Sequence, residues 1–401
     1  MRWWRYSSSM FALLSHPAHN NIRSLIAAIC CAAVCGIVFG LTAPLISLQL
    51  EIRFGSGLIE GYNVAAGALS TVFLAPFAPY FMKIVRPRVL LIISLIAAGA
   101  LFSLFTFFTS AWVWFFIRLI VGSFITMVFV ISETWINQIV SPERRAFMLG
   151  VYGTALAGGF GVGALIFTVI DQASGTGFYV AGAILLLGTM PVAFLRGPGA
   201  TAPDNDSASL RAIVRAMGIA PAAIAAGLAF GAMETLMFSM IPVYAIRLDL
   251  APDVIGMMMF AAAMGGIFIQ VPIGWIADKT DRRQTLVWIA LASAIGPLLI
   301  WQFGTQLALV LPLLFIQAGV ASGLYTVGLA LLGERFSGGA IAAANAAMIT
   351  VYGLGSLFAP PVTGIAMDSI GPHGLMLVLS IISGSYFLFL LFVRGRPQEG
   401  S

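Results

Sequence analysis

Glu234 is a carboxylate deep inside a long apolar stretch, where it could carry out proton chemistry. It is the only charged residue between Arg215 and Arg247. On a helix rising about 1.5 Å per residue, it lies about 28 Å from the first of these anchors and about 20 Å from the second. A carboxylate in apolar surroundings can be poised between its charged and neutral forms, and can then take up and release protons. The alternative is a neutral Glu that makes only a structural hydrogen bond.

Arg118 is the second isolated charge, and no other charged residue occurs between residues 89 and 132. A guanidinium keeps its proton, so Arg118 would act by biasing a nearby carboxylate or by holding an anionic substrate. A cation that anchors helix ends through their carbonyls is the alternative. We expect Arg118 to be the electrostatic partner of Glu234 in proton or substrate coupling.

A third group of charges follows the apolar run that ends near residue 277. Gly274 opens this stretch, and its charged residues are Asp278, Lys279, Arg282 and Arg283. We expect the five residues to form a charge lock at the inner membrane face. Glu133 and Glu334 lie near the inner ends of their spans. We expect them to clasp the basic loops when the inner face is closed and to release them when it opens. Asp171 and Asp368, at outer helix ends, are expected to be solvated.

Neutral polar residues within the apolar runs are candidates for a central cavity. They are Tyr62, Asn63, Gln270, Gln317, Tyr325, Asn345 and Tyr352. Any one of them alone is more often a helix–helix hydrogen bond than a binding group. A cavity with few charges favours a small neutral, amphipathic or singly anionic solute.

The elements that position these residues are predicted to be membrane-spanning helices. The chain is 60% hydrophobic with a mean hydropathy of +1.01, against about 45–50% apolar residues in soluble domains. Apolar runs of about 20 residues, the length that crosses a bilayer, recur throughout. We predict an all-α integral membrane protein with twelve spans, over 25–50, 60–82, 89–109, 112–137, 146–171, 177–195, 215–246, 253–277, 285–304, 307–333, 340–367 and 373–393.

Basic residues predict the orientation of these spans. Most of the 20 Lys and Arg residues fall in segments on the side of the two termini. Arg53 and Arg247 lie on the other side, and Arg118 lies within a span. Cytoplasmic segments are enriched in Lys and Arg. We therefore expect both termini to be cytoplasmic. The basic pI of about 9.3 then reflects orientation rather than a nucleic-acid partner.

Several kinds of chemistry find no support in the sequence. Cys30, Cys31 and Cys35 all fall inside the first span, where free Cys is a small packing residue. The three His residues are at polar margins and form no metal or nucleophilic constellation. A Gly-rich nucleotide cradle is absent from the sequence. We expect no enzyme activity, metal or cofactor.

The chain reads as two copies of one six-helix unit. The parallel stretches are Pro44–Leu50 with Pro242–Leu248, Leu58–Gly61 with Asp253–Gly256, Val151–Gly153 with Val351–Gly353, and Glu133 with Glu334. A Pro-, Gly- and Ser-containing linker separates the copies. We expect a tail over 1–24, a bundle over 25–196, a linker over 197–214, a second bundle over 215–394 and a tail over 395–401.

Such a duplication is a recurring architecture of secondary transporters, and the motifs resemble those of the major facilitator superfamily (MFS) across all twelve spans. The 274–283 stretch resembles its signature loop between spans eight and nine. Arg118-Leu-Ile-Val-Gly122 resembles its fourth-span Arg motif, which the family links to proton coupling. Within the superfamily the chain is similar to the YcaD-like group of bacterial transporters, on 270–279, 133–137 and 353–360.

The sequence departs from that family pattern at three places. Met82 occupies the position of the acidic residue in the first-half copy of the signature loop, so the two halves are expected to be gated unequally. Phe124 replaces the second Gly of the Arg motif. The fifth span lacks a Gly-Pro pair, which weakens a resemblance to the superfamily's drug/proton antiporters.

The resemblance implies a secondary active transporter that moves a small solute by alternating access, with a proton as coupling ion. It also implies a location in a bacterial cytoplasmic (inner) membrane. We expect a monomer whose partners are its small-molecule substrate, protons and the lipid bilayer. A facilitative uniporter and an MFS-like receptor or scaffold that transports nothing are the alternatives. The receptor alternative predicts that Glu234 and Arg118 are packed and sealed.

Overall fold

The computed structural model describes residues 18–74, 77–140, 142–194, 217–336 and 340–393, and within them the regular structure is helical. The elements, in chain order, are α2 (Ala18–Phe54), α3 (Gly57–Leu74), α4 (Ala78–Ile84), α5 (Pro87–Phe102), η2 (Ser103–Thr106), α6 (Ala111–Ile139), α7 (Pro142–Val169), α8 (Thr176–Phe194), α10 (Pro221–Ser239), α11 (Ile241–Ile246), α12 (Pro252–Phe268), α13 (Gln270–Ala277), α14 (Arg282–Phe303), α15 (Leu307–Arg335), α16 (Ala340–Ile370) and α17 (Gly374–Phe392). The predicted linker and most of both predicted tails lie outside the described residues.

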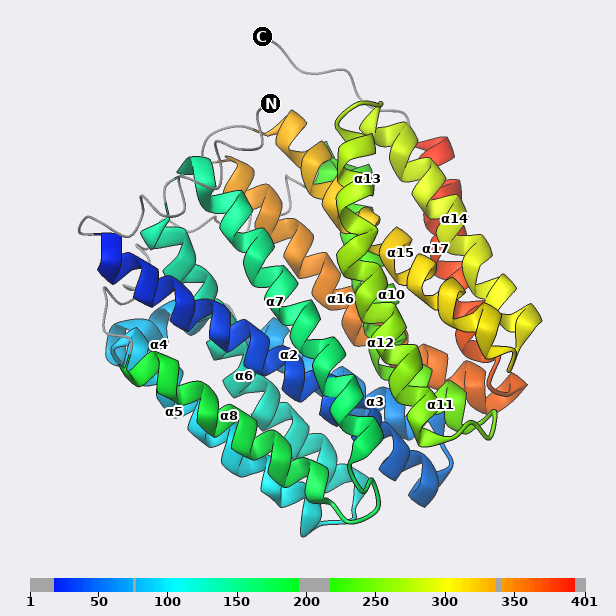
Figure 1. The fold of residues 1–401 in the computed structure, drawn as a ribbon. Coiled ribbons are helices and arrows are strands. Elements are labelled where there is room, and N and C mark those ends of the chain that lie inside the picture. The colour runs from blue at the N-terminus through cyan, green and yellow to red at the C-terminus, as the bar shows by residue number, and fades with distance from the viewer. Residues whose placement is uncertain (1–17, 75–76, 141, 195–216, 337–339, 394–401) are drawn as a thin grey trace.

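The helices form two bundles with the same internal pairing. In the first half, α2 packs on α7, α3 on α6 and α5 on α8. The second half repeats this order, with α10 on α16, α12 on α15 and α14 on α17. Figure 1 shows the first half from blue to green and the second from yellow-green to red. This repetition confirms the predicted two pseudo-symmetric six-helix bundles.

The halves meet along two helix pairs, α3 with α16 and α7 with α12. We call the face where α2 begins and α17 ends the proximal face. The opposite face, where α2 ends at Phe54 and α17 begins at Gly374, is the distal face (Figure 1). These names carry no assumption about the compartment on either side.

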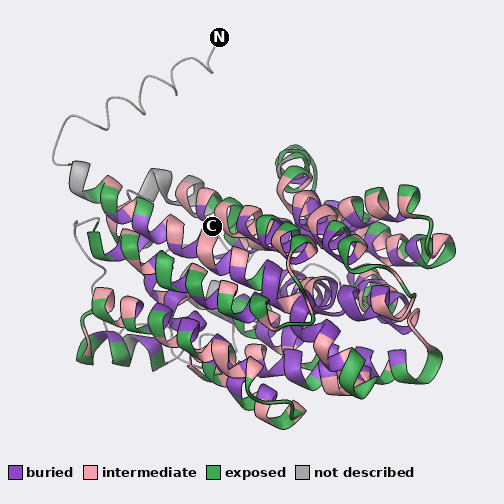
Figure 2. Cartoon of the chain, turned by 60° about the horizontal axis from the view of Figure 1, so that its bottom comes forward, coloured by how far each residue is buried: buried purple, intermediate pink, exposed green. Residues whose placement is uncertain are grey.

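Eleven helices in the described part of the chain are long and apolar enough to cross a membrane. The predicted span at 60–82 is the exception, because it comprises α3 and the short α4. Polar residues on α3, including Glu60 and Asn63, lower its hydropathy. In Figure 2 exposed residues follow the outer flanks of the bundle. Large apolar side chains such as Phe116 and Phe392 are exposed, as lipid-facing residues would be.

Glycines let α2 and α7 approach within backbone contact. A Cβ added at Gly36 or Gly40 of α2 would lie 2.0–2.1 Å from a carbonyl oxygen of α7. Gly159 and Gly163 of α7 face carbonyls of α2 in the same way, at 2.0–2.3 Å. Small residues allow this close packing inside a membrane, where dispersion and not water exclusion drives association.

Candidate functional site

A buried carboxylate on α3, Glu60, pairs with Arg118 of α6. Glu60 is 0% exposed, and its Oε1 atom lies 3.8 Å from Nη1 of Arg118. The same oxygen accepts a hydrogen bond of 2.6 Å from the Ser47 hydroxyl on α2. Glu60 Oε2 and Arg118 Nη1 are buried without a hydrogen-bond partner. The pair is therefore incompletely satisfied, which is costly for buried charged groups.

Ser47 links this pair to the other half of the molecule. Its hydroxyl lies 2.6 Å from Glu60 Oε1 and 3.1 Å from the Ser239 carbonyl oxygen on α10. A hydroxyl has one proton to donate. The two acceptors, one in each half, therefore compete for it.

Glu234 on α10 occupies a different environment. Its Oε2 atom accepts a hydrogen bond of 2.5 Å from the Tyr352 hydroxyl on α16. The Tyr352 ring forms a trio with Phe230 and Tyr325, and the ring centroids are 5.4–6.3 Å apart. Glu234 and all three aromatic residues are half-buried. In the described part of the chain, Glu234 forms no ion pair.

The expected pairing of Arg118 with Glu234 is therefore wrong for this structure, because Arg118 has Glu60 as its partner. Sequence reasoning missed Glu60, although a signal was available. In the alignment of the two halves, Leu58–Gly61 matches Asp253–Gly256, so Glu60 stands where the second half has Ile255. A charge in one copy opposite an apolar residue in the other indicates a function that the halves do not share.

Three charged residues tie the halves together at the distal face; we call Glu51, Arg247 and Asp368 the distal clasp. Arg247 donates from Nε to Glu51 Oε1 and from Nη2 to Asp368 Oδ1, each at 2.7 Å. Glu51 belongs to α2 of the first half, and the other two belong to the second. Burial lowers the pKa of Arg247, but its hydrogen bonds to the two carboxylates outweigh burial and raise it overall.

Asp368 is exposed, as expected of an outer helix end, but it also caps α3 across the interface. Its carboxylate accepts the backbone N–H groups of Gly57 at 2.7 Å and Leu58 at 3.1 Å, and the Ser56 hydroxyl at 3.1 Å. Unpaired N–H groups at a helix start attract a carboxylate. Here that carboxylate comes from the other half of the molecule. Asp171 accepts from Ala173 N in an exposed loop.

The predicted charge lock at 274–283 sits at the proximal face; we call Asp278, Arg282 and Glu334 the proximal brace. Arg282 lies 3.1 Å from Glu334 and 3.5 Å from Asp278, and it donates to the Ala330 carbonyl at 2.7 Å. Asp278 is 71% exposed. All of these groups belong to the second half, so the brace connects α13, α14 and α15 with one another.

Other residues of the stretch also bond within the second half. Arg283 donates to the carbonyls of Leu390, at 2.7 Å, and Val393 at the end of α17. Lys279 lies over the Trp275 ring at 3.5 Å. Gly274 lies within α13, where an added Cβ would meet no neighbouring atom.

The first half has a copy of the 274–283 loop, which keeps the contact between an arginine and a helix end. This copy lacks the acidic residue, whose position Met82 occupies. Arg88 donates at 2.7 Å to the Val192 carbonyl near the end of α8, as Arg283 does at the end of α17. Met82 is buried, with 3% of its surface exposed. An acidic side chain in that position would be costly to bury without a partner.

Glu133 makes no hydrogen bond or ion pair with any described residue. Glu133 is exposed to solvent, although many protein atoms lie around its side chain. It lies within electrostatic range of Tyr152 on α7 and of Tyr325 on α15. The side chains of Arg144 and Arg145, its expected basic neighbours, lie outside the described residues.

The structure separates the remaining cavity candidates. Gln270 donates to Thr326 at 2.7 Å, and buried Gln317 donates to the Ser293 carbonyl at 3.2 Å. These are helix–helix contacts, and buried Asn63 likewise donates to backbone carbonyls. Tyr62 is exposed, and the Asn345 side chain lies outside the described residues. Only Tyr325 and Tyr352 join Glu234.

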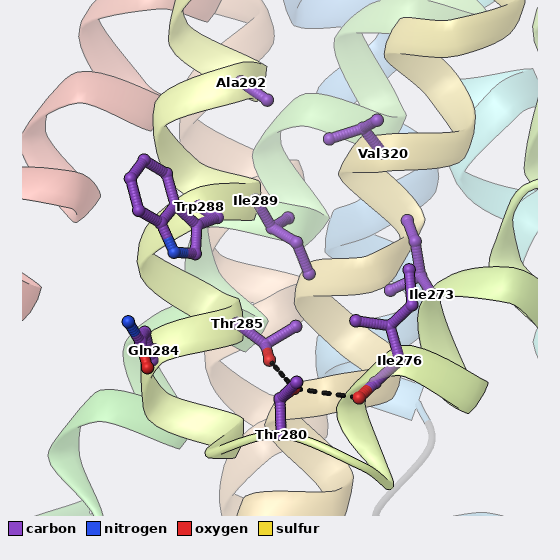
Figure 3. A pocket seen from close by; sticks show the side chains of 9 residues that line it. All are labelled: Ile273, Ile276, Thr280, Gln284, Thr285, Trp288, Ile289, Ala292 and Val320. Carbon is purple, nitrogen blue, oxygen red and sulfur yellow. Dashed lines mark hydrogen bonds between the residues drawn. The ribbon is translucent and has the colours of Figure 1, made fainter.

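A groove of about 410 Å³ lies elsewhere, between α13, α14 and α15 (Figure 3). Its walls include Ile273, Thr280, Trp288 and Val320. Figure 3 shows Thr280 bonded to Thr285 and to the Ile276 carbonyl at one end. The two threonine hydroxyls are thus already paired, and neither Glu60 nor Glu234 lines the groove.

Comparison with known proteins agrees with this architecture. The family model described as Major Facilitator Superfamily matches residues 28–251 and 222–401. The chain is 28% identical over 380 residues to the uncharacterized MFS-type transporter YfkF of Bacillus subtilis (strain 168), covering 92% of this chain and 94% of that protein. It is 26% identical over 295 residues to the uncharacterized MFS-type transporter YcaD of Escherichia coli O139:H28 (strain E24377A / ETEC), covering 72% and 74%.

Solved structures show the same fold. A mutant of the nucleoside transporter NupG superimposes with a TM-score of 0.75 at 13% identity, covering 92% of this chain and 98% of that one. A bacterial homolog to the human lysosomal transporter Spinster, in an inward-facing and unoccupied conformation, superimposes with a TM-score of 0.71 at 13% identity, covering 93% and 94%.

Proposed function

The chain belongs to the Major Facilitator Superfamily, and on that premise we propose that it is a proton-coupled secondary active transporter that works by alternating access. It is an integral membrane protein of a transporter family. The coupling, the gates and the direction of access are our proposal. We also propose that it acts as a monomer in a bacterial inner membrane with its proximal face in the cytoplasm, where most of its basic residues lie.

The observation that carries the proposal is the distribution of polar contacts between the halves. The clasp, the Asp368 contacts to α3 and the Ser47–Ser239 contact all lie toward the distal face. The proximal brace bonds within one half. Alternating access requires contacts across one face to break while those across the other form. This distribution supports a state that is closed distally.

Two carboxylates are suited to couple a proton to this change. Glu60 and the Ser239 carbonyl compete for the single Ser47 proton. A proton on Glu60 lets this residue donate to Ser47 and leaves the Ser47 hydroxyl free to bond across the halves. The same proton removes the negative charge facing Arg118. Glu234, which accepts a hydrogen bond from Tyr352, is the second candidate. Ionisable side chains inside a membrane are costly and usually have a function.

Flux measurements in reconstituted vesicles test this proposal. A thermal-shift screen of small solutes on the purified protein identifies a ligand, and its radiolabelled form is then loaded outside vesicles. We expect an imposed pH gradient to concentrate the ligand. Glu234→Gln and Glu60→Gln should each abolish the response to the gradient. Asp171→Asn is the matched control, because Asp171 is a loop carboxylate that takes no part in the proposed coupling.

Other outcomes would assign one of the alternatives. Flux that only equilibrates the ligand, with no response to the gradient in the unaltered protein, indicates a facilitative uniporter. A ligand that binds and never crosses indicates a receptor or scaffold. If Glu234→Gln kept a full gradient response, its assignment as a coupling residue would be wrong.

A further inference from the structure

Two carboxylates and three aromatic rings from four helices gather between the halves. We call Glu133, Phe230, Glu234, Tyr325 and Tyr352 the carboxylate–aromatic cluster. Glu133 comes from α6 of the first half, and the other four come from α10, α15 and α16 of the second. The Tyr325 hydroxyl lies within electrostatic range of both carboxylates. The cluster is thus built by both halves.

The cluster holds two carboxylates and, among the side chains that the structure describes, no cation pairs with them. Arg118, the nearest expected partner, is held by Glu60. Glu133 makes no hydrogen bond with a described residue, although protein surrounds it closely. An unpaired carboxylate in such surroundings is costly unless a ligand or a proton neutralises it.

The aromatic rings supply the other component of a cation site, besides the carboxylates. Phe230, Tyr325 and Tyr352 are packed with ring centroids 5.4–6.3 Å apart, and each ring keeps part of its surface open. The face of an aromatic ring attracts a cation, and this attraction strengthens when water is excluded. Aromatic faces beside carboxylates are the surroundings that substituted ammonium groups prefer.

From this arrangement we infer that the carboxylate–aromatic cluster binds the substrate, and that the substrate is an organic cation with a substituted ammonium group on an apolar body. The inference rests on the proposed transport function and narrows its substrate class. The sequence led to an expectation of a small neutral, amphipathic or singly anionic solute, and the inference narrows this to an amphipathic cation. The sequence could not show that two carboxylates lie within electrostatic range of the same tyrosine.

A matched set of probes tests the inference on the purified full-length protein. The probes are benzyltrimethylammonium, its neutral isostere neopentylbenzene, and benzenesulfonate as the anion. Binding is measured by isothermal titration calorimetry at pH 7.5. We expect the cation to bind at least about 30-fold more tightly than the neutral isostere, which corresponds to about 2 kcal/mol. Benzenesulfonate should show no binding.

Variants connect that preference to the cluster. Glu234→Gln and Tyr325→Leu should each weaken cation binding by about tenfold or more, whereas Tyr325→Phe keeps the ring and should keep most of the affinity. Asp171→Asn is the charge-matched control and should bind like the unaltered protein. Equal binding of the cation and its isostere, or full affinity in Glu234→Gln, would overturn the inference.

The result separates this inference from the transport proposal. A neutral or anionic ligand that a pH gradient concentrates in vesicles would refute the cation site and leave proton-coupled transport standing. A cation that binds at the cluster without crossing the membrane would support the site and refute transport.

Discussion

The distal and proximal faces use the same kinds of residue for different purposes. At the distal face, Arg247 joins carboxylates from both halves, at 2.7 Å each. At the proximal face, Arg282 joins two carboxylates of one half, at 3.1 and 3.5 Å. Each is an arginine between two acids. Only the distal arrangement must break for the halves to separate.

This difference shows that an ion pair can act as a gate only when it crosses the moving interface. The proximal brace connects α13, α14 and α15, which move together if each half is a rigid body. Its loss should therefore loosen the second half without opening the distal face. The following predictions, from the largest effect to the smallest, test that contrast.

Arg247→Gln should have the largest effect, because it removes one partner from two ion pairs that are mostly shielded from water. Removing one partner of such a pair costs about 3 kcal/mol. The distally closed state should therefore lose about 100-fold in population. The reporter is Ser239→Cys, a buried position below the clasp, with Cys30, Cys31 and Cys35 replaced by alanine. Its labelling by an impermeant maleimide should accelerate accordingly.

Arg53→Gln is the matched control for that experiment. Arg53 lies near the same face and hydrogen-bonds Gln49 of its own helix, so its substitution should leave the labelling of Ser239→Cys unchanged. If Arg53→Gln and Arg247→Gln accelerated labelling equally, the clasp would not be a specific gate.

Asp368→Asn should have an intermediate effect on the same reporter. The amide keeps one acceptor oxygen for the α3 N–H groups but loses the charge that faces Arg247. We expect a cost to the closed state of about 1–2 kcal/mol, similar to the loss of a helix cap. Labelling of Ser239→Cys should then rise about tenfold, and Asp253→Asn serves as control. No increase would mean that Asp368 caps α3 without holding the halves together.

Arg282→Gln should destabilise the second half by about 1 kcal/mol, because it removes a hydrogen bond to Ala330 and the contact to Glu334. Thermal unfolding of the purified protein in detergent should report a lower Tm. Distal labelling of Ser239→Cys should stay at its original rate. A marked acceleration would show that the brace communicates with the distal gate.

Asp278→Asn should have the smallest effect. Asp278 is 71% exposed and 3.5 Å from Arg282, and exposed pairs contribute at most about 0.5 kcal/mol. The sequence predicts that this change loosens the inner gate while folding stays intact. Because Asp278 and Arg282 belong to the same half, the structure predicts no loosening: labelling of Thr71→Cys, an exposed position in the proximal part of α3, should stay within about twofold of its original rate. An unchanged rate would count against any gate role for Asp278.

Much of the architecture could be predicted because apolar runs and repeated motifs can be recognised from short stretches of sequence. Apolar runs located the spans, and the repeated stretches located the two halves. Pairings between side chains could not be predicted in the same way. Arg118 has Glu60 as its partner, 58 positions away in sequence, and nothing local distinguishes Glu60 from Glu234 as a partner. The contacts of Asp368 to α3 could not be predicted because Gly57 and Leu58 belong to the other half.

The sequence by itself determined the fold class, the family and the residue types that could do chemistry, since hydropathy and motifs depend only on neighbouring positions. The tertiary structure decided which charges meet. It made the exposed Asp368 a link between the halves and placed Glu234 among aromatic rings. Electrostatic interactions fall off with distance and grow with burial, and both quantities exist only once the helices are packed.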